Sequence, residues 1–320
     1  MEELDREAQA FDSQIAERIR QGHIPDIRLT QPCEYFYNNS WRHPEYVKID
    51  MGEQLDLIGS VLRRRQCLQA KPLRVLEVGC GPGWLSLELA RLGYRVTGLD
   101  LSSDCINVAM KQAQSDPWLE SRGALEYIAG DFFQSGFADG SFDAVVFLGS
   151  LHHFADQRKV MAEVERVLGS EGIVVAHEPT RDRMTEGNAT FIHLLRVILS
   201  AGKGYYLETP IPADITVHEK EISQIYREMK YEDESGENVQ SAHDNDAGHK
   251  EMYAALLESF SEMEYQERYA FFHEMIGGLR FGQATNNLLA RYLRDTDGKL
   301  CKLGMLQPTE FLFVGKKKAL

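Results

Sequence analysis

The feature that most constrains the fold is the alternation of short apolar runs with helical segments over residues 74–179. The runs RVLEVG, RVTGLD, LEYIAG, FDAVVFLG and GIVVAHEP have the length and β-branched content of strands. Runs that are apolar at nearly every position are typical of strands buried on both faces. Because helical segments separate them, these strands predict a parallel sheet with right-handed crossovers, which is a doubly wound α/β domain.

The chain of 320 residues is longer than a minimal α/β domain and predicts additional segments. Apolar residues at spacings of three and four predict an amphipathic helix over residues 4–19. We expect four segments: an N-terminal helical and aromatic extension (1–70), the α/β core (71–177), an inserted helical lid or substrate cap (178–248) and a C-terminal return to the core sheet (249–320). The third segment contains the polar stretch EDESGENVQSAHDNDAGH, and such a stretch inside a compact domain is either functional or mobile.

Charge and cysteine content exclude several classes of protein. Acidic residues outnumber basic ones by 49 to 35, and the formal net charge of −14 opposes binding to a phosphate backbone. The sequence has no apolar stretch long enough to cross a membrane, and the N-terminus MEELDREAQAF is acidic where a signal peptide is basic. The five cysteines form no C-x-x-C pair, which predicts reduced thiols. We therefore expect a cytoplasmic protein with a small molecule as its partner, without nucleic acid or membrane, and of undetermined oligomeric state.

The strongest local motif is VLEVGCGPGWLSLELA, residues 75–90, which predicts a buried strand, a glycine turn and a helix. Glycines allow the backbone to turn sharply and to approach a ligand without an intervening Cβ. We therefore expect a cofactor to lie against this turn. The dinucleotide fingerprint G-x-G-x-x-G is not satisfied, because Trp84 stands where its third glycine belongs, and NAD is disfavoured.

The run E-x-G-x-G-x-G resembles the first motif of class I S-adenosylmethionine (SAM)-dependent methyltransferases. The resemblance extends to Asp100 at the end of the next strand, to YIAGDFF, to FDAVVFLGSLHHF, and to TEFLFVGKK as the antiparallel seventh strand. It implies a Rossmann-like, mostly parallel seven-stranded sheet, SAM as the cofactor, and methyl transfer to a small molecule. The cofactor-binding residues that it implies are Glu77, Gly79, Gly81, Gly83, Asp100, Leu101, Asp131, Phe132 and Leu148.

Other interpretations of these residues remain open at this level. Glu77 is either part of the cofactor site or a capping or surface carboxylate, and Asp131 either meets the adenine or caps the following turn. An enzyme that keeps the cofactor but catalyses a cyclisation or elimination, or a non-catalytic binding protein, would share the same motifs.

Catalytic candidates are expected at the carboxyl ends of the strands, where ligands bind in open α/β sheets. A general base is needed only if the acceptor atom arrives protonated, and the fold allows oxygen, nitrogen or carbon acceptors. We expect His177, oriented by the adjacent Glu178, to be that base, and His153 after the fourth strand is a further candidate.

Two further segments contain residues that suit a ligand. CEYFYNNSWRHPEY could fold over the cofactor and place Tyr35 beside the sulfonium, or its aromatics could anchor the extension on the core. His243, Asp244, Asp246 and His249 offer nitrogen and oxygen ligands at close spacing. A solvated acidic loop is the favoured interpretation of that stretch, and no metal is expected.

Overall fold

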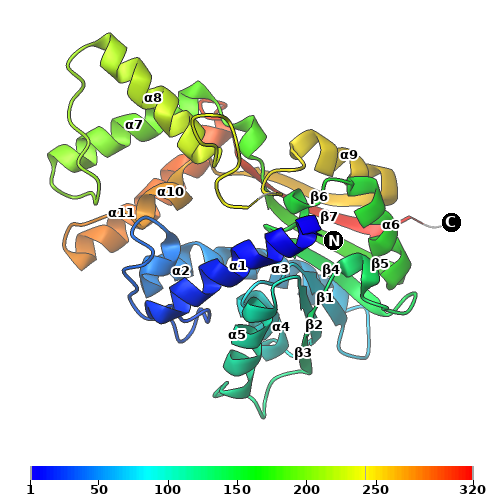
Figure 1. Ribbon diagram of the computed structural model, residues 1–320. Coiled ribbons are helices and arrows are strands. Elements are labelled where there is room, and N and C mark those ends of the chain that lie inside the picture. Colours follow the sequence, from blue (N-terminus) through cyan, green and yellow to red (C-terminus); the bar gives the residue numbers. More distant parts are fainter. Residues whose placement is uncertain (1, 242, 319–320) are drawn as a thin grey trace.

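A computed structural model describes residues 2–241 and 243–318, and its strands lie in one mixed sheet (Figure 1). Within the described residues the sheet has the strand order β3-β2-β1-β4-β5-β7-β6. The strands are β1 (Arg74–Val78), β2 (Arg95–Asp100), β3 (Leu125–Ala129), β4 (Phe142–Leu148), β5 (Leu168–Pro179), β6 (Phe260–Arg268) and β7 (Glu310–Lys317). The first five pair in parallel, and β7 pairs antiparallel with both β5 and β6. This confirms the predicted doubly wound α/β fold with an antiparallel closing strand.

Helices cover both faces of the sheet, because its central strands are apolar on both faces. One face carries α3 (Met51–Gln66), α4 (Trp84–Arg91) and α5 (Ser103–Gln114), and the other carries α6 (Gln157–Val167) and α9 (His249–Ser259). Leu62 of α3 and Leu89 of α4 are fully buried against Val75 and Val146. The two layers fix the carboxyl ends of β1, β2, β4 and β5 at one edge of the sheet.

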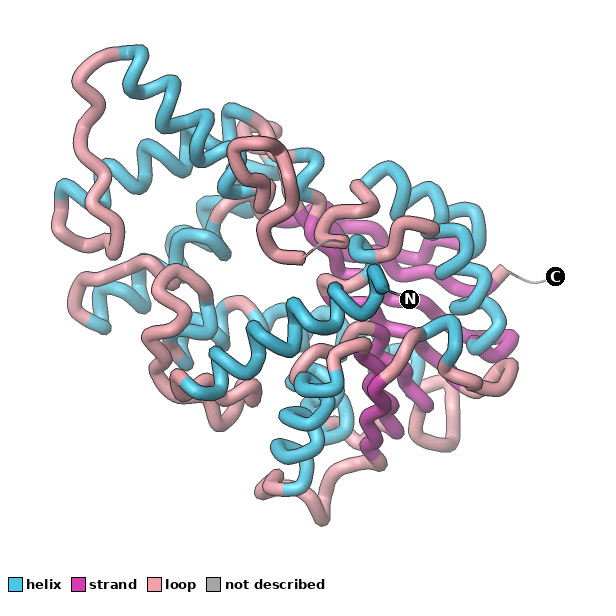
Figure 2. Tube along the Cα trace, in the orientation of Figure 1, coloured by secondary structure: helices cyan, strands magenta, loops and turns pink. Residues whose placement is uncertain are grey.

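A second apolar core lies beside the sheet and is built from helices and the loops between them. It joins α2 (Pro44–Ile49), α7 (Glu186–Ala201), α8 (Ile215–Met229), α10 (Phe272–Ile276) and α11 (Gln283–Lys302). Figure 2 shows these helices and their loops grouped to one side of the strands. The core includes Phe272 and Leu293, which lie in the part of the chain expected to return to the sheet. We therefore propose that the cap extends beyond 178–248 and takes in α2, α10 and α11.

The N-terminal extension is held on the core by α1 (Glu2–Arg20) and by the loop after it. Helix α1 packs on α5, and Asp12 accepts a hydrogen bond from Ser102 Oγ at 2.5 Å. In the loop, Asp26 pairs with the buried Arg91 of α4 at 2.6 Å. The described chain also contains the short 3-10 helices η1 (Ser40–Arg42), η2 (Phe132–Gln134), η3 (Leu151–His153) and η4 (Arg181–Arg183). Among the helices described, none combines the length and the apolar character needed to span a bilayer.

Candidate active site

The glycine turn after β1 forms the floor of a cavity at the carboxyl end of the sheet. Gly79, Gly81 and Gly83 have φ values of 73°, 51° and 82°, a region that residues with a Cβ disfavour. A Cβ on Gly79 would lie 2.4 Å from the Cβ of Ser150, whereas one on Gly81 would meet nothing within 4 Å. The turn therefore packs tightly at Gly79 and faces open space at Gly81.

Asp100 lies beside this turn at the end of β2. Its carboxylate accepts hydrogen bonds from the backbone N–H groups of Gly81 at 2.7 Å and Ser102 at 2.9 Å. Burial raises the pKa of Asp100, and these two N–H groups act against that shift. The turn and Asp100 border a cavity of about 400 Å³, which we call the turn cavity.

Most of the residues expected to bind the cofactor line the turn cavity. They are Gly79, Gly81, Asp100, Leu101, Asp131 and Phe132, and His153 joins them from η3. Asp131 lines the cavity and also caps the N-terminus of η2, where its Oδ1 accepts the N–H of Phe133 at 2.9 Å. Both interpretations of Asp131 from sequence are therefore compatible with its position.

Four expected cofactor residues lie elsewhere. Glu77 points away from the cavity and is hydrogen-bonded to Ser86 of α4. Gly83 supports packing, since a Cβ there would lie 2.6 Å from both Ala109 Cβ and Tyr127 Oη. The others are Leu148, which lines a different cavity, and Tyr35, which packs edge-on against Phe36. The motif gives the order of these residues along the chain. Which of them face the cavity depends on how the strands, the turn and the helix pack together.

Helix α1 closes the turn cavity, and the aromatic segment around Tyr35 does not. Glu7, Phe11, Gln14 and Ile15 of α1 line the cavity, together with Gln240 from the loop after α8. The sequence signal for this was the apolar spacing of the N-terminal helix, which indicated only that the helix packs on something. Which surface it covers is decided by the contact between α1 and α5.

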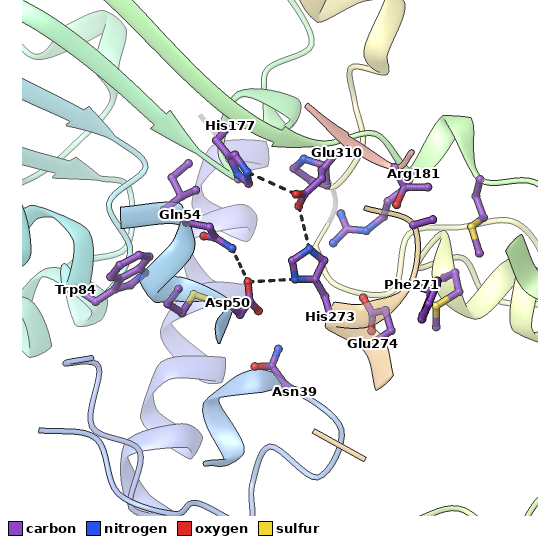
Figure 3. Close-up of a pocket in the computed structure, with 18 residues that line it drawn as sticks. Asn39, Asp50, Gln54, Trp84, His177, Arg181, Phe271, His273, Glu274 and Glu310 are labelled. Carbon is purple, nitrogen blue, oxygen red and sulfur yellow. Dashed lines mark hydrogen bonds and ion pairs between the residues drawn. The ribbon is translucent and has the colours of Figure 1, made fainter. Parts of the chain in front are cut away.

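A second cavity of about 320 Å³ lies between the sheet edge and the second core, and we call it the cap cavity (Figure 3). Leu148 and His177 reach it from the ends of β4 and β5, while Trp84 reaches it from the start of α4. Gly149 lines both cavities, so the two meet at the loop after β4. The two cavities are therefore adjacent at this loop.

A chain of polar side chains crosses the wall of the cap cavity from β5 to the N-terminal extension (Figure 3). His177 Nε2 lies 3.6 Å from Glu310 Oε1 on β7, and Glu310 Oε2 lies 3.1 Å from His273 Nε2 on α10. On the other side of the ring, His273 Nδ1 lies 3.1 Å from Asp50 Oδ1. Gln54 of α3 donates to the same Asp50 oxygen at 2.8 Å.

Two members of this polar chain, Glu310 and His273, carry opposite charges at neutral pH. Loss of hydration acts against ionisation of Glu310, yet His273 and His177 beside it hold its pKa well below the usual range. Loss of hydration also acts against the imidazolium of His273, yet Asp50 and Glu310 hold its pKa well above the usual range. His177 thus faces a carboxylate that is kept ionised by a neighbouring cation.

The expectation that Glu178 orients His177 is corrected by the structure. Glu178 is fully buried on the opposite face of β5, because successive side chains of a strand alternate between faces. Its carboxylate accepts the N–H groups of Ser150 at 3.1 Å and Leu151 at 3.0 Å. Glu178 therefore anchors the loop after β4, and the carboxylate that faces His177 is that of Glu310.

Comparison with known proteins places the glycine turn and Asp100 in a known family. A family model described as a methyltransferase domain matches residues 76–176. Residues 76–176 are a class I SAM-dependent methyltransferase domain. The match ends one residue before His177, so the closing strand and the cap lie outside it.

Curated relatives match less than half of this chain. The mitochondrial ubiquinone biosynthesis O-methyltransferase of Schizosaccharomyces pombe is 33% identical over 147 residues, 45% of this chain and 52% of that protein. A sterol 24-C-methyltransferase of Neurospora crassa is 31% identical over 148 residues, 46% of this chain and 34% of that protein. The demethylmenaquinone methyltransferase of Thermus thermophilus is 29% identical over 160 residues, 47% of this chain and 70% of that protein. The chain thus spans about half or less of the first two relatives.

A solved structure extends the likeness to the whole chain at the level of fold. A provisionally named sarcosine dimethylglycine methyltransferase from Galdieria sulphuraria superposes with a TM-score of 0.52 at 14% sequence identity. The superposition covers 96% of this chain and 98% of that one. At this identity the likeness shows a shared fold around the methyltransferase domain.

Sequence reasoning missed four members of the polar chain: Asp50, Gln54, His273 and Glu310. Glu310 opens the closing strand TEFLFVGKK, where an acid at the start of an apolar strand was the available signal. His273 carried none, because it is positioned from α11, where the buried carboxylate of Asp297 accepts the N–H groups of Ala270, Phe271 and Phe272 at 2.8–3.0 Å. Those bonds hold the start of α10 and so set the place of His273.

Replacing Glu77 with glutamine is expected to stabilise the ligand-free methyltransferase domain at alkaline pH. Burial raises the pKa of Glu77 to about 8, although Ser86 favours the carboxylate through a hydrogen bond. An acid with a raised pKa retains its proton in the folded state, so stability falls as pH rises from about 4.5 toward 8. Glutamine removes that dependence, and we expect a gain on the order of 2 kcal/mol at pH 8 with little change at pH 4. Urea unfolding at both pH values measures this, and an equal effect at both would contradict it.

Proposed function

We propose that this chain transfers the methyl group of SAM to a small molecule that is bound in the cap cavity. The observation that supports the proposal most is the meeting of the two cavities at Gly149, with His177 in the wall of the second. Small-molecule methyltransferases among the relatives are consistent with it. The cap, which the family model does not cover, would then decide which acceptor is used.

The residues of the turn cavity fit the cofactor of this family. When bound, SAM supplies a methyl group activated by its sulfonium, so the protein has to align the acceptor and exclude water. We assign Asp100 to the ribose hydroxyls, because it lines the cavity and its carboxylate retains acceptor capacity beyond the N–H groups of Gly81 and Ser102. Gly79 and Gly81 would leave room for the methionine part, and Leu101, Asp131 and Phe132 would surround the adenine.

His177 is the proposed general base for an acceptor that arrives with an O–H or N–H group. As the acceptor atom bonds to the methyl carbon and the carbon–sulfur bond breaks, the acceptor's proton would pass to the imidazole of His177. The carboxylate of Glu310 would stabilise the resulting imidazolium at 3.6 Å. Because His273 keeps Glu310 ionised, this carboxylate is ready to do so at neutral pH.

The proposal is tested by incubating the full chain with SAM labelled in its methyl group. Phenols, aliphatic amines, hydroxy acids and a protein-free metabolite extract would be offered as acceptors, and both labelled product and S-adenosylhomocysteine would be measured by mass spectrometry. We expect label in a small molecule, with one S-adenosylhomocysteine released per methyl group. Product without S-adenosylhomocysteine would indicate a non-methylating reaction, and S-adenosylhomocysteine binding without transfer to any pool would indicate a binding protein.

A further inference from the structure

In the stretch His243–His249, Asp244 is placed unlike the other residues that could bind a metal. Asp244 is fully buried, and it reaches His152 in η3, where His152 Nε2 lies 3.4 Å from Asp244 Oδ1. The other ligand-type residues of this stretch are engaged elsewhere: His243 pairs with Asp246 at 2.6 Å, and His249 meets the hydroxyl of Tyr265 at 2.6 Å. The Asp244 carboxylate is therefore buried, although this loop was expected to be solvated.

We propose that His152, His153 and Asp244 form a zinc-binding site at the mouth of the turn cavity. Each of the three offers one ligand atom, and these atoms lie within 4.8 Å of one another. Asp244 Oδ2 is buried without a hydrogen-bond partner among the described residues, which is costly for a carboxylate oxygen unless a cation meets it. The site lies outside the cap cavity and does not depend on the proposed reaction.

The surroundings of His152 match those of a metal ligand. Metal-binding histidines usually present their other ring nitrogen to a carboxylate, which fixes the tautomer and the ring orientation. His152 Nδ1 lies 2.8 Å from Glu178 Oε2, and His153 Nδ1 lies 3.1 Å from Glu7 Oε1. His152 therefore shows this pattern in full, whereas His153 has the carboxylate nearby without hydrogen-bond geometry to it. The other ring nitrogen of His152, Nε2, faces Asp244 Oδ1 at 3.4 Å.

The ligand set and the local charge favour zinc. Two imidazoles with one carboxylate is a donor set that zinc accepts readily, with a fourth position left open, whereas calcium and magnesium prefer oxygen ligands alone. The carboxylates in contact with the cluster are Glu7, Glu178 and Asp244, and the guanidinium of Arg181 lies 3.3 Å from Asp244 Oδ1. Without an ion, Asp244 and Glu178 raise the pKa of His152 against the effect of its burial. Zinc binding requires neutral imidazoles, and three negative charges with one positive charge then leave a net charge of −2 that a divalent cation balances.

The position of the cluster gives the ion a structural role. Glu7 belongs to α1, His153 lines the turn cavity, and Asp244 belongs to the loop that also brings Gln240 to that cavity. Glu7 in addition accepts Ser241 Oγ at 2.7 Å. Zinc would therefore connect the loop of Asp244 to His152 and His153 in the loop after β4, with Glu7 of α1 beside them. Zinc binding would then order α1 and the loop of Asp244, the two segments that close the turn cavity.

The test measures zinc binding to the full, tag-free chain by competition calorimetry after treatment with a chelator. A Cys67→Ser background removes an exposed thiol that binds zinc adventitiously. We expect one zinc per chain, a higher melting temperature with zinc, and binding weakened by about 100-fold or more in Asp244→Asn, beyond the roughly 10–100-fold loss expected for an outer partner such as Glu7→Gln. His243→Gln is the matched control, because the imidazole of His243 pairs with Asp246 and the substitution leaves its backbone N–H bond to Glu7 in place. This variant should bind zinc as the parent does.

Several outcomes would overturn the assignment. These are absence of stoichiometric zinc, unchanged binding in Asp244→Asn, or an equal loss in His243→Gln, which would place adventitious zinc on the surface of the loop. Cobalt substitution gives a second readout, since two imidazoles and one carboxylate in a near-tetrahedral site produce intense visible bands. If Asp244→Asn fails to fold by circular dichroism, Glu7→Gln decides, and unchanged affinity in that variant refutes the site.

Discussion

Replacing His177 with glutamine is expected to lower the turnover number by about 10²–10⁴-fold while the affinity for the cofactor stays within a few-fold of wild type. Positioned general bases contribute on that scale, and glutamine preserves the size of the side chain but cannot take a proton. His177 lines the cap cavity and not the turn cavity, so cofactor binding should be spared. Turnover with the acceptor found above, and calorimetry with S-adenosylhomocysteine, separate the two effects.

The control for this prediction is His218→Gln, because His218 lies on α8 and lines neither cavity. It should leave turnover unchanged. Turnover of His177→Gln within threefold of wild type would remove His177 from the mechanism, and would leave an acceptor that needs no base.

Glu310→Gln gives a companion test with a pH readout. Removing the carboxylate beside His177 takes away the charge that would stabilise the imidazolium formed in the reaction, so turnover should fall. The pH readout of this test is the folding stability. The stabilisation from Glu310 is fully present above about pH 4.5 and is lost as pH falls through its lowered pKa. The stabilisation from His273 is fully present below about pH 6.5 and is lost as pH rises through its raised pKa. In the wild type the pair therefore stays ionised between about pH 4.5 and pH 6.5, whereas Glu310→Gln lacks the pair and should be less stable there. Urea unfolding at those pH values separates this loss of stability from an effect on turnover.

Replacing Asp100 with asparagine is expected to weaken S-adenosylhomocysteine binding by about 10–100-fold, or about 1.4–2.7 kcal/mol. The carboxylate can accept two ribose hydroxyls beyond the N–H groups of Gly81 and Ser102, and asparagine has only one acceptor oxygen. Because burial raises the pKa of Asp100, wild-type affinity should also fall as pH is lowered toward that pKa, and the variant should lose this dependence.

Calorimetry on the wild type, Asp100→Asn and Asp104→Asn checks the second prediction. Asp104 is exposed on α5 and carries the same charge a short distance along the chain, so its variant controls for a general electrostatic effect. Equal weakening in both variants would contradict a specific ribose contact. No binding by the folded wild type would indicate that the acceptor must bind first or that the cavity holds another nucleotide.

The sequence determined the methyltransferase domain because its signals are local. Buried parallel strands require apolar residues on both faces, and a turn that approaches a ligand requires glycines, so RVLEVG and Gly81 could be interpreted without the rest of the chain. The placement of Asp100 beside that turn also follows, since adjacent parallel strands end at the same edge. These inferences used residues that are close in sequence or related by regular geometry.

The tertiary structure alone decided how the cavities are closed and which carboxylate serves His177. Glu178 was its neighbour in sequence, but alternation along β5 sends it to the opposite face, where it holds Ser150 and Leu151. Glu310 comes from a strand over 130 residues later (310 − 177 = 133), and it reaches His177 because β7 pairs with β5. Contacts between distant segments depend on packing of whole elements, and no local pattern encodes them. The N-terminal helix, the cap and the buried Asp244 belong to that second class for the same reason.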